Sequence, residues 1–502
     1  MKKSSNMRRL PPAAALAAAL AALLLCLCSC FPIIVEYDET PAQKTAEAST
    51  AELTYAELTT GAVPEGISPS EVTVAEPDLV SPLASFPDRD FSDRSLAIAV
   101  ASETVSALMP DEDALFYPAC VKRAEAVAKK YGSMPQFISC PLQDIIDGIK
   151  KTQASGGSSP DDFYADVLEI PATASGKLAL AGQLVNLHTL PFYAPAEDES
   201  SSAGSLNGRL WFEISETTED PGALLLMLCR RDATNDGCAS LYSAALSGKF
   251  TFEYLLTAAA GMAGENGAGK VTAVSSAVPA GILGEAAVLR SGLRYTDDLE
   301  SGRELSWTKE ENLPRLTALI SSLAAVVRTD VLPESGEGSP LDLFRKDEAK
   351  FYVCSLEEFD ASFREEKTDY ALLPLPYATD NPAGVAVRKN VLCVPVINTR
   401  SEMIGLALNA FRAVSGEWIA QTYIPVFASE MMRDNDSLFT LKLILSERRR
   451  VDFAEIMGES VKNLGALTYE AAYAAMTSET PLAEITADAA AALNKLLAQN
   501  KK

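Results

Sequence analysis

The chain has 502 residues, of which 48% are apolar, with 68 acidic and 43 basic residues and a formal net charge of −25. This composition is typical of a globular protein, and the negative field disfavours binding to nucleic acid or anionic lipid headgroups because no extended basic segment offsets it. Acidity is also a common solubility feature, so the charge alone does not identify an acidic binding cleft.

The first 30 residues have the layout of an export signal. A basic start over residues 1–9 precedes the apolar run Ala13–Leu25, which is shorter than the roughly 20 residues that a helix needs to cross a bilayer. Leu27-Cys28-Ser29-Cys30 then resembles the bacterial lipobox, whose final cysteine takes a diacylglycerol. We expect residues 1–30 to be a lipoprotein signal and Cys30 to anchor the chain on the extracytoplasmic face of the cell membrane. An uncleaved anchor with incidental cysteines is the alternative.

Residues 31–93 are expected to form a disordered acidic linker. The segment is rich in Ala, Thr, Glu, Pro and Ser, and Lys44 is its only basic residue up to Pro87. A segment of low hydrophobicity and one sign of charge cannot bury enough surface to fold. As a flexible coil it would hold the body roughly 40 Å from the membrane.

The body after the linker has about 400 residues. This is more than a domain with one hydrophobic core usually contains, so we expect two lobes. The first part of the body alternates between apolar runs and helical patterns. The expected order is a strand at 95–101, a helix through 121–130, an extended segment at 135–140, a helix at 144–151 and a strand at 164–170. Such alternation predicts an α/β domain with a largely parallel sheet.

The second part of the body continues this alternation and ends in helices. Strands are expected at 209–215, 223–229, 351–354, 369–375 and 391–396. Helical patterns cover 241–263 and 313–327 and most of the last hundred residues. No span-length apolar run occurs after the signal, which indicates a soluble body.

Six cysteines lie outside the signal: Cys120, Cys140, Cys229, Cys238, Cys354 and Cys393. Cys354 and Cys393 fall in apolar runs, where a cysteine usually acts as a small buried hydrophobe. The pairs Cys229–Cys238 and Cys120–Cys140 are the ones to test for a disulfide. The sequence leaves their state open, because six cysteines allow fifteen connectivities.

Catalytic or metal chemistry has little support. His188 is the only histidine, and the mature chain has no CxxC motif, which disfavours a metal centre. Paired carboxylates could serve glycoside hydrolysis, but acidic residues are so abundant that any pair can be nominated. We therefore expect no cofactor and no enzymatic activity, with a surface glycosidase as an alternative.

Several short stretches resemble the extracellular solute-binding lipoproteins of ABC importers, in particular the sugar-type family 1. In chain order they are Tyr164-Ala-Asp-Val, Ala181–Leu187, Ser247–Glu253, Asp369–Pro376 with its Pro-Leu-Pro, and the segment 434–452. Departures from the family pattern are Tyr377 for the lysine after Pro-Leu-Pro, Phe250 for a tryptophan, and Arg230-Arg231 for an Asn-Lys pair. The resemblance therefore supports the fold better than the identity of the ligand.

The resemblance implies a two-lobed, periplasmic-binding-protein-like α/β fold of type 2 with a helical C-terminal region. We expect an N-terminal lobe from residues 94–226 and 371–428 and a C-terminal lobe from residues 227–370 and 429–500. Such lobes close on a small solute at the carboxyl ends of their strands. The implied ligand is a neutral solute, a carbohydrate above all, and the implied partner of this monomer is an ABC permease.

Sugar-binding proteins stack sugar rings on aromatic side chains and use carboxylates for the hydroxyl groups. On that basis the candidate ligand-binding residues are Glu103, Asp166, Tyr295, Trp307 and Tyr377. The chain has only three tryptophans. This scarcity leaves an alternative, a surface lipoprotein of the same fold that serves as a sensory or adhesion module without transport.

Overall fold

The computed structural model describes residues 78–458 except 115, 158–161, 197–202, 235, 263–271, 279, 300–301, 307–308, 310, 313, 315–338, 366–367, 378–383, 416–429 and 448–450. A few positions outside this range are also described, including the short parallel strands β1 (Glu52–Leu53) and β2 (Thr73–Val74). The described residues all belong to one compact unit, Thr50–Lys502. The predicted signal with Cys30, most of the predicted linker, and Trp307 lie outside the described residues. Residues 78–93 of that linker are described, and Leu83 and Phe91 are buried there, so this end of the predicted linker is ordered.

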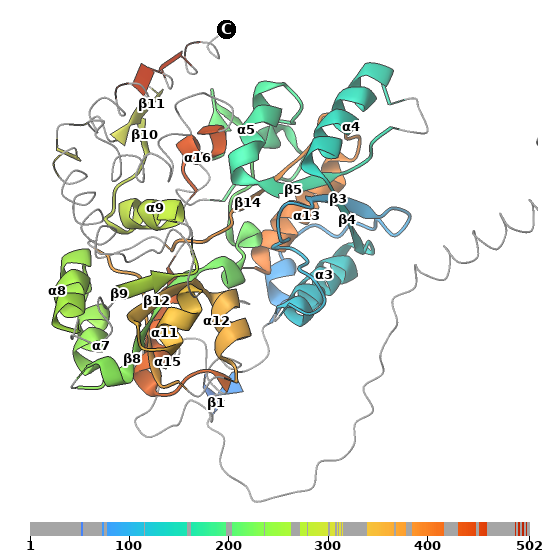
Figure 1. Ribbon diagram of the computed structural model, residues 1–502. Helices are drawn as coiled ribbons and strands as arrows, with labels where there is room; N and C mark the ends of the chain where they lie inside the picture. Colours follow the sequence, from blue (N-terminus) through green and yellow to red (C-terminus); the bar gives the residue numbers. More distant parts are fainter. Residues whose placement is uncertain are drawn as a thin grey trace, which may run out of the picture. The chain divides into compact units, whose positions relative to one another are not determined.

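The first sheet has four strands in the order β14-β5-β3-β4. They are β3 (Leu96–Ala101), β4 (Pro135–Cys140), β5 (Val167–Pro171) and β14 (Asn390–Cys393). Strand β3 pairs in parallel with β4 and β5, and β14 runs antiparallel to β5. The sheet is therefore largely parallel, as predicted (Figure 1).

Helices cover both faces of the first sheet. Along β3, Ile98 and Val100 pack in one apolar cluster with α3 (Tyr117–Tyr131) and α13 (Ser401–Ala413). The alternating residues Ala99 and Ala101 pack in the other with α4 (Leu142–Ser155) and α5 (Ala172–Leu180). Because successive side chains of a strand point to opposite faces, every residue of β3 is buried, which explains its uninterrupted apolar run.

The second sheet also has four strands, in the order β13-β8-β12-β9. They are β8 (Leu225–Arg230), β9 (Thr272–Ser276), β12 (Ala349–Ser355) and β13 (Tyr370–Leu373). Only β12 and β9 pair in parallel, whereas β8 runs antiparallel to both β12 and β13. The second sheet is therefore mixed, and its buried strands β8 and β12 are apolar whatever their direction.

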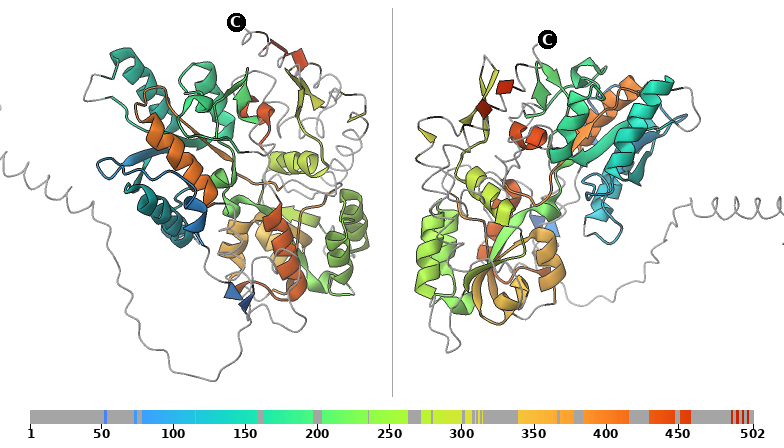
Figure 2. Two further views of the ribbon diagram at one scale, coloured as in Figure 1. Left: turned by 180° about the vertical axis from the view of Figure 1, so that it is seen from behind. Right: turned by 45° about the horizontal axis from the view of Figure 1, so that its top comes forward.

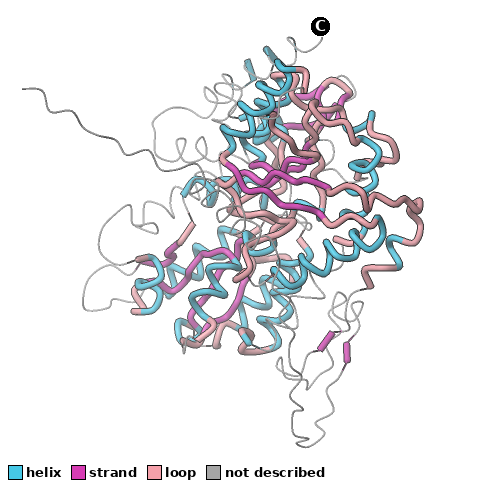
Figure 3. The backbone as a smooth tube through the Cα atoms, turned by 90° about the vertical axis from the view of Figure 1, so that its right-hand side faces the viewer, coloured by secondary structure: helices cyan, strands magenta, loops and turns pink. Residues whose placement is uncertain are grey.

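The second sheet is likewise covered on both faces. One apolar cluster joins it to α11 (Pro340–Arg345), α12 (Leu356–Phe363) and α15 (Asn435–Ser446). The other cluster joins it to α7 (Ala239–Leu246), α8 (Phe252–Met262) and α9 (Ala280–Arg290). Figure 2 shows α13 and α15 from behind, and in Figure 3 the strands of the two four-stranded sheets form separate groups.

Two segments carry the chain between the sheets. Residues 211–224 lead to β8, and residues 374–389 lead from β13 to β14. The two segments meet at the antiparallel bridge Leu224↔Ala386. None of the helices in the described part of the chain has the length and apolar character that a bilayer crossing requires.

The structure corrects some of the expected elements. The strand expected at 209–215 is reduced to β7 (Arg209–Leu210), paired with β6 (Ser205–Leu206), and a bridge between Glu213 and Leu392. The helical region at 241–263 is split into α7 and α8, because Gly248 takes a left-handed conformation with φ 74°. Strand β9, helix α9 and the hairpin of β10 (Thr296–Leu299) and β11 (Gly302–Leu305) were not predicted.

The described residues between 401 and 458 are mostly helical, as predicted, and form α13, α15 and the short α16 (Phe453–Gly458). The helix expected at 313–327 falls almost wholly outside the described residues.

Candidate functional site

The loop after β3, residues 102–116, leaves the carboxyl end of a central strand of the first sheet. The carboxyl ends of parallel strands are the usual place for ligands in α/β sheets. Glu169 of β5 lies beneath this loop with 0% of its surface exposed. Its carboxylate accepts hydrogen bonds from the Ser106 hydroxyl at 2.6 Å and from the backbone N–H of Ala107. The carboxylate therefore fixes the middle of the loop.

Two further buried side chains hold the same loop. Asn390 of β14 donates to the carbonyl of Val105 at 2.7 Å and accepts from the Thr104 hydroxyl at 2.7 Å. Arg123 of α3, also 0% exposed, donates to the carbonyl of Ala107 at 2.7 Å. With its backbone groups paired in this way, the loop has a defined shape before any ligand arrives.

Burial raises the pKa of the Glu169 carboxyl above its usual value, because removal from water disfavours the charged form. Hydrogen bonds from Ser106, Ala107 and Asn390, together with the positive charge of Arg123, oppose this rise. The balance leaves a carboxyl that takes up a proton more readily than an exposed glutamate.

Two cavities border this loop. The first, of about 350 Å³, is lined by Glu103, Phe137 and Ser139 among others. The second, of about 340 Å³, lies between the loop and α12 and is lined among others by Phe116, Asp220 and Glu357. Both cavities share four residues: Val105, Pro110, Asp111 and Arg388.

Arg388 belongs to the segment that returns from β13 to β14. Its Nη2 donates to Asp220 at 2.6 Å and to Glu357 at 2.7 Å, so it connects the other crossing segment with α12. Its buried Nε has no hydrogen-bond partner among the described residues. A buried N–H without a partner is costly, so a ligand or water oxygen at this position would be favourable.

The chemistry of the cavities is that of a polar binding site. The second cavity is lined by Arg388, which pairs with Asp220 and Glu357, and by three further acidic residues: Asp111, Asp113 and Asp360. Carboxylate oxygens accept hydrogen bonds from hydroxyl groups, and the phenylalanine rings of Phe116 and Phe137 offer apolar surface. The arrangement suits a small solute that carries many hydroxyl groups.

Of the predicted ligand-binding residues, Glu103 lines the first cavity. Its carboxylate also accepts from the backbone N–H of Leu142 at 2.9 Å, at the start of α4. Asp166 is 0% exposed and lines neither cavity. It accepts from the backbone N–H of Ala97, the Tyr164 hydroxyl and the Asn398 amide at 2.8, 2.8 and 2.9 Å, so it joins segments within the first sheet region.

Tyr295 and Tyr377 are buried, at 0% and 4% exposed, and also lie apart from these two cavities. The backbone N–H of Tyr295 donates to Asp452 at 3.1 Å. The Tyr377 hydroxyl donates to the carbonyl of Ala245, and the Arg290 guanidinium lies 5.4 Å from its ring centre. The contacts of these residues are thus within the protein, and their part in ligand binding stays a prediction.

Sequence reasoning missed Asp111 and Arg388, the polar residues common to both cavities. A signal for Asp111 was present, because Asp111-Glu-Asp113 follows the first buried strand within a short loop. Arg388 carried no such signal, since its partners Asp220 and Glu357 are distant in the sequence.

No family model and no curated protein matches the sequence. The structure, however, is similar to a cyclo/maltodextrin-binding protein solved with maltotetraose, with a TM-score of 0.50 at 11% identity over 83% of this chain and 99% of that one. This likeness confirms the predicted fold class, the two-lobed α/β fold of periplasmic-binding-type proteins.

Two further structures match at lower TM-scores. One is an ABC substrate-binding protein from Listeria monocytogenes in complex with cycloalternan, with a TM-score of 0.47 at 10% identity over 82% of this chain and 100% of that one. The other is a cyclic alpha-maltosyl-1,6-maltose binding protein from Arthrobacter globiformis, with a TM-score of 0.46 at 12% identity over 81% of this chain and 100% of that one. All three are described as binding proteins and none as an enzyme.

Proposed function

We propose that the protein is a monomeric, extracytoplasmic solute-binding protein that captures a carbohydrate and passes it to an ABC permease. The observation that carries the proposal is the loop after β3. Buried Glu169 and Asn390 hold it in place, and it presents Asp111 beside Arg388 to two adjoining cavities. The fold, and the maltotetraose bound to the similar cyclo/maltodextrin-binding protein, support the carbohydrate class.

The two sheets suggest how capture would work. The strands of the first sheet fall within residues 94–226 and 371–428, which would form one lobe. The second sheet would form the core of the other lobe, from residues 227–370 and 429–500, although the start of β8 and most of β13 lie in the residues predicted for the first lobe. The crossing segments that meet at Leu224↔Ala386 would act as the hinge.

The cavity residues would make different kinds of contact with the sugar. Asp111 would accept hydrogen bonds from sugar hydroxyl groups, and the Nε of Arg388 would donate to a sugar oxygen. The ion pairs of Arg388 with Asp220 and Glu357 keep its guanidinium in one orientation. Such fixed polar groups favour one ligand geometry without a large ordering cost.

Calorimetric titration with a panel of mono- and oligosaccharides tests the proposal. Asp111→Asn should weaken the binding of the best ligand by about tenfold or more, because hydrogen bonds to a charged group contribute about 1.5–3 kcal/mol. Asp93→Asn is the matched control, since Asp93 is an exposed aspartate that lines neither cavity. Failure of every sugar to bind, or unchanged affinity in Asp111→Asn, would refute the proposal.

Anchoring at Cys30 is a separate part of the proposal, supported by the lipobox resemblance of residues 27–30. A two-chain lipid would keep the protein near its permease, since each buried methylene contributes about 0.8 kcal/mol. Cys30→Ala should move the protein from the membrane fraction to the medium. Unchanged membrane association would contradict this anchor.

A surface lipoprotein without transport is the second candidate function. Neither cavity is lined by tryptophan or tyrosine, the rings on which sugars usually stack. An uptake assay separates the two functions. Deletion of the protein should abolish uptake of the bound sugar if the protein serves a permease, and should leave uptake unchanged if it is a sensory or adhesion module.

A further inference from the structure

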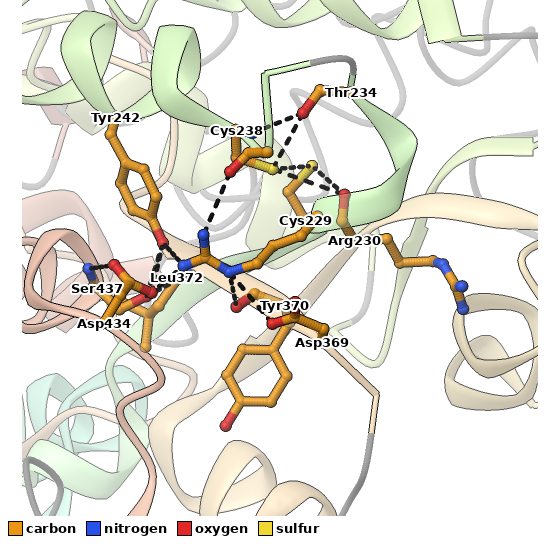
Figure 4. A network of polar contacts seen from close by, with 12 residues as sticks. Cys229, Arg230, Thr234, Cys238, Tyr242, Asp369, Tyr370, Leu372, Asp434 and Ser437 are labelled. Carbon is orange, nitrogen blue, oxygen red and sulfur yellow. Dashed lines mark hydrogen bonds and ion pairs between the residues drawn. The ribbon is translucent and has the colours of Figure 1, made fainter.

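A pair of cysteines lies at the loop after β8, on the second sheet. Cys229 is in β8, and Cys238 directly precedes α7. Both residues are 0% exposed, and their sulfur atoms lie 3.5 Å apart (Figure 4). Cys120 and Cys140, the other pair that the sequence suggested, lie on α3 and at the end of β4, and the Cys120 thiol contacts the carbonyl of Ala107 at 3.8 Å instead.

The backbone of Cys238 directs its sulfur toward the strand. The residue has φ 74°, a left-handed conformation that is uncommon for residues other than glycine. Its N–H donates to the Thr234 hydroxyl at 2.6 Å and to the Asp236 carboxylate at 3.1 Å, which hold this conformation in place. The approach of the two sulfur atoms is therefore built into the loop and does not depend on a flexible side chain.

The two thiols also differ from the other cysteines in acidity. The Cys238 thiol donates to the Cys229 sulfur at 3.5 Å. Its hydrogen bond with Cys229 lowers the pKa of Cys238, and the Thr234 hydroxyl and the Arg231 charge act in the same direction, against the effect of burial. Burial raises the pKa of Cys354 and Cys393, which have no such partners. Because the thiolate is the form that attacks a disulfide, Cys238 is suited to react first.

We propose that Cys229 and Cys238 form a dithiol site that a disulfide oxidant, of protein or low molecular weight, closes to a disulfide. The Cys238 thiolate attacks one sulfur of the oxidant and releases the first thiolate. The Cys229 thiolate then attacks the Cys238 sulfur of the mixed disulfide and releases the second. The cysteine pair loses two electrons and two protons, and the oxidant is reduced to two thiols.

The bond would close the loop that carries Arg231. Within this loop the Arg231 guanidinium donates to the carbonyl of Tyr370 at 3.2 Å and to the Tyr242 hydroxyl at 3.0 Å. It also forms ion pairs with Asp434 and, at 3.2 Å, with Asp369. Figure 4 shows Tyr242 of α7, Tyr370 of β13 with the preceding Asp369, and Asp434 next to α15 close to one another. A Cys229–Cys238 bond would therefore stabilise a junction of three elements.

The surroundings allow the oxidant to reach this site. Asp232 and Asp236 of the same loop are exposed, so the loop lies at the surface. Both thiols are buried, so the proposed reaction requires local opening of this loop. Disulfides persist in oxidising compartments, and an exported chain would meet such conditions. The proposal does not depend on sugar binding and can fail or hold independently of it.

Differential alkylation of the full chain tests the disulfide directly. The reduced, unfolded protein is refolded with glutathione disulfide, unfolded again, alkylated, then reduced and alkylated with a second reagent before peptide mass spectrometry. Cys229 and Cys238 should carry the second label, and Cys120, Cys140, Cys354 and Cys393 the first. A first label on Cys229 and Cys238, or a bond from either to another cysteine, would overturn the proposal.

Thermal unfolding tests whether the Cys229–Cys238 disulfide stabilises the protein. Reductant should lower the Tm of the oxidised wild type by roughly 5 °C, since a short-loop disulfide stabilises mainly by constraining the unfolded chain. Cys238→Ala should show no response to reductant, whereas Cys354→Ala, which removes another buried thiol from the same sheet, should keep it. A wild-type Tm that does not respond to reductant would refute the stabilising role.

Discussion

The loops after β3 and after β8 lie at corresponding places, each at the carboxyl end of a central strand in a four-stranded sheet. The first loop borders two cavities. The second loop folds back onto its strand, so that a buried cysteine contacts another and Arg231 contacts three elements. The first loop therefore leaves space beside it, where we propose that the ligand binds, and the second is closed by its own side chains.

The side chains that hold the two loops in place, Glu169 and Arg231, also differ in their surroundings. Glu169 under the first loop is fully buried and receives hydrogen bonds from neutral groups, a hydroxyl, a backbone N–H and an amide. Arg231 in the second loop is 21% exposed and pairs with the carboxylates of Asp369 and Asp434. Glu169 thus fixes the first loop through neutral hydrogen-bond donors, whereas the partly exposed ion pairs of Arg231 join elements at the surface.

Removal of the Glu169 carboxylate should have the largest effect. Glu169→Ala leaves the Ser106 hydroxyl and the Ala107 N–H buried without their acceptor, which should lower the free energy of unfolding by about 3 kcal/mol. Denaturant unfolding measures this change. Glu125→Ala, at an exposed position on α3, should change it by less than about 0.5 kcal/mol. Equal effects of the two substitutions would show that Glu169 does not anchor the loop.

Arg231→Ala should have a smaller effect, about 2 kcal/mol, because its side chain is partly exposed and solvent screens its ion pairs. The comparison variant is Arg94→Ala, whose pairing with Asp93 at 3.3 Å is on the surface and should contribute at most about 0.5 kcal/mol. Denaturant unfolding again provides the measurement. If Arg231→Ala lowers the free energy of unfolding by no more than Arg94→Ala does, the contacts of Arg231 at the second loop do not stabilise the fold.

The pH dependence of stability distinguishes the two anchors further. The folded-state pKa of Glu169 is raised above the ordinary 4.5, so the folded chain keeps this proton where the unfolded chain has lost it. Its contribution is fully present below about pH 4.5 and is lost as the pH rises through the folded pKa. The unfolding free energy of the wild type relative to Glu169→Gln should therefore fall as the pH rises from 4.5. A difference that grows with pH would contradict the raised pKa.

Much of the fold could be predicted from local patterns, but the pairing of strands and side chains could not. The apolar runs at β3, β8 and β12 were evident because each strand is buried on both faces. Nothing in those runs distinguishes the antiparallel pairing of β8 with β12 from the parallel pairing of β12 with β9. Strand existence is encoded locally, whereas strand direction depends on the connections.

The site was less predictable than the fold. Glu103 was recognisable because it follows the first buried strand, and it does line a cavity. Tyr377 has the same kind of position after β13, yet its hydroxyl bonds to the carbonyl of Ala245, far away in the sequence. Arg388 is defined by its contacts with Asp220 and Glu357, which only the tertiary structure brings together.

A crystal structure of the protein with its highest-affinity sugar tests the central claim most directly. The predicted result is a sugar against the loop after β3, with hydroxyl groups donating to Asp111 and an oxygen accepting from Arg388 in the cavities that these two residues share. A sugar bound elsewhere, with Asp111 and Arg388 in contact only with water and protein, would contradict the assignment of this site.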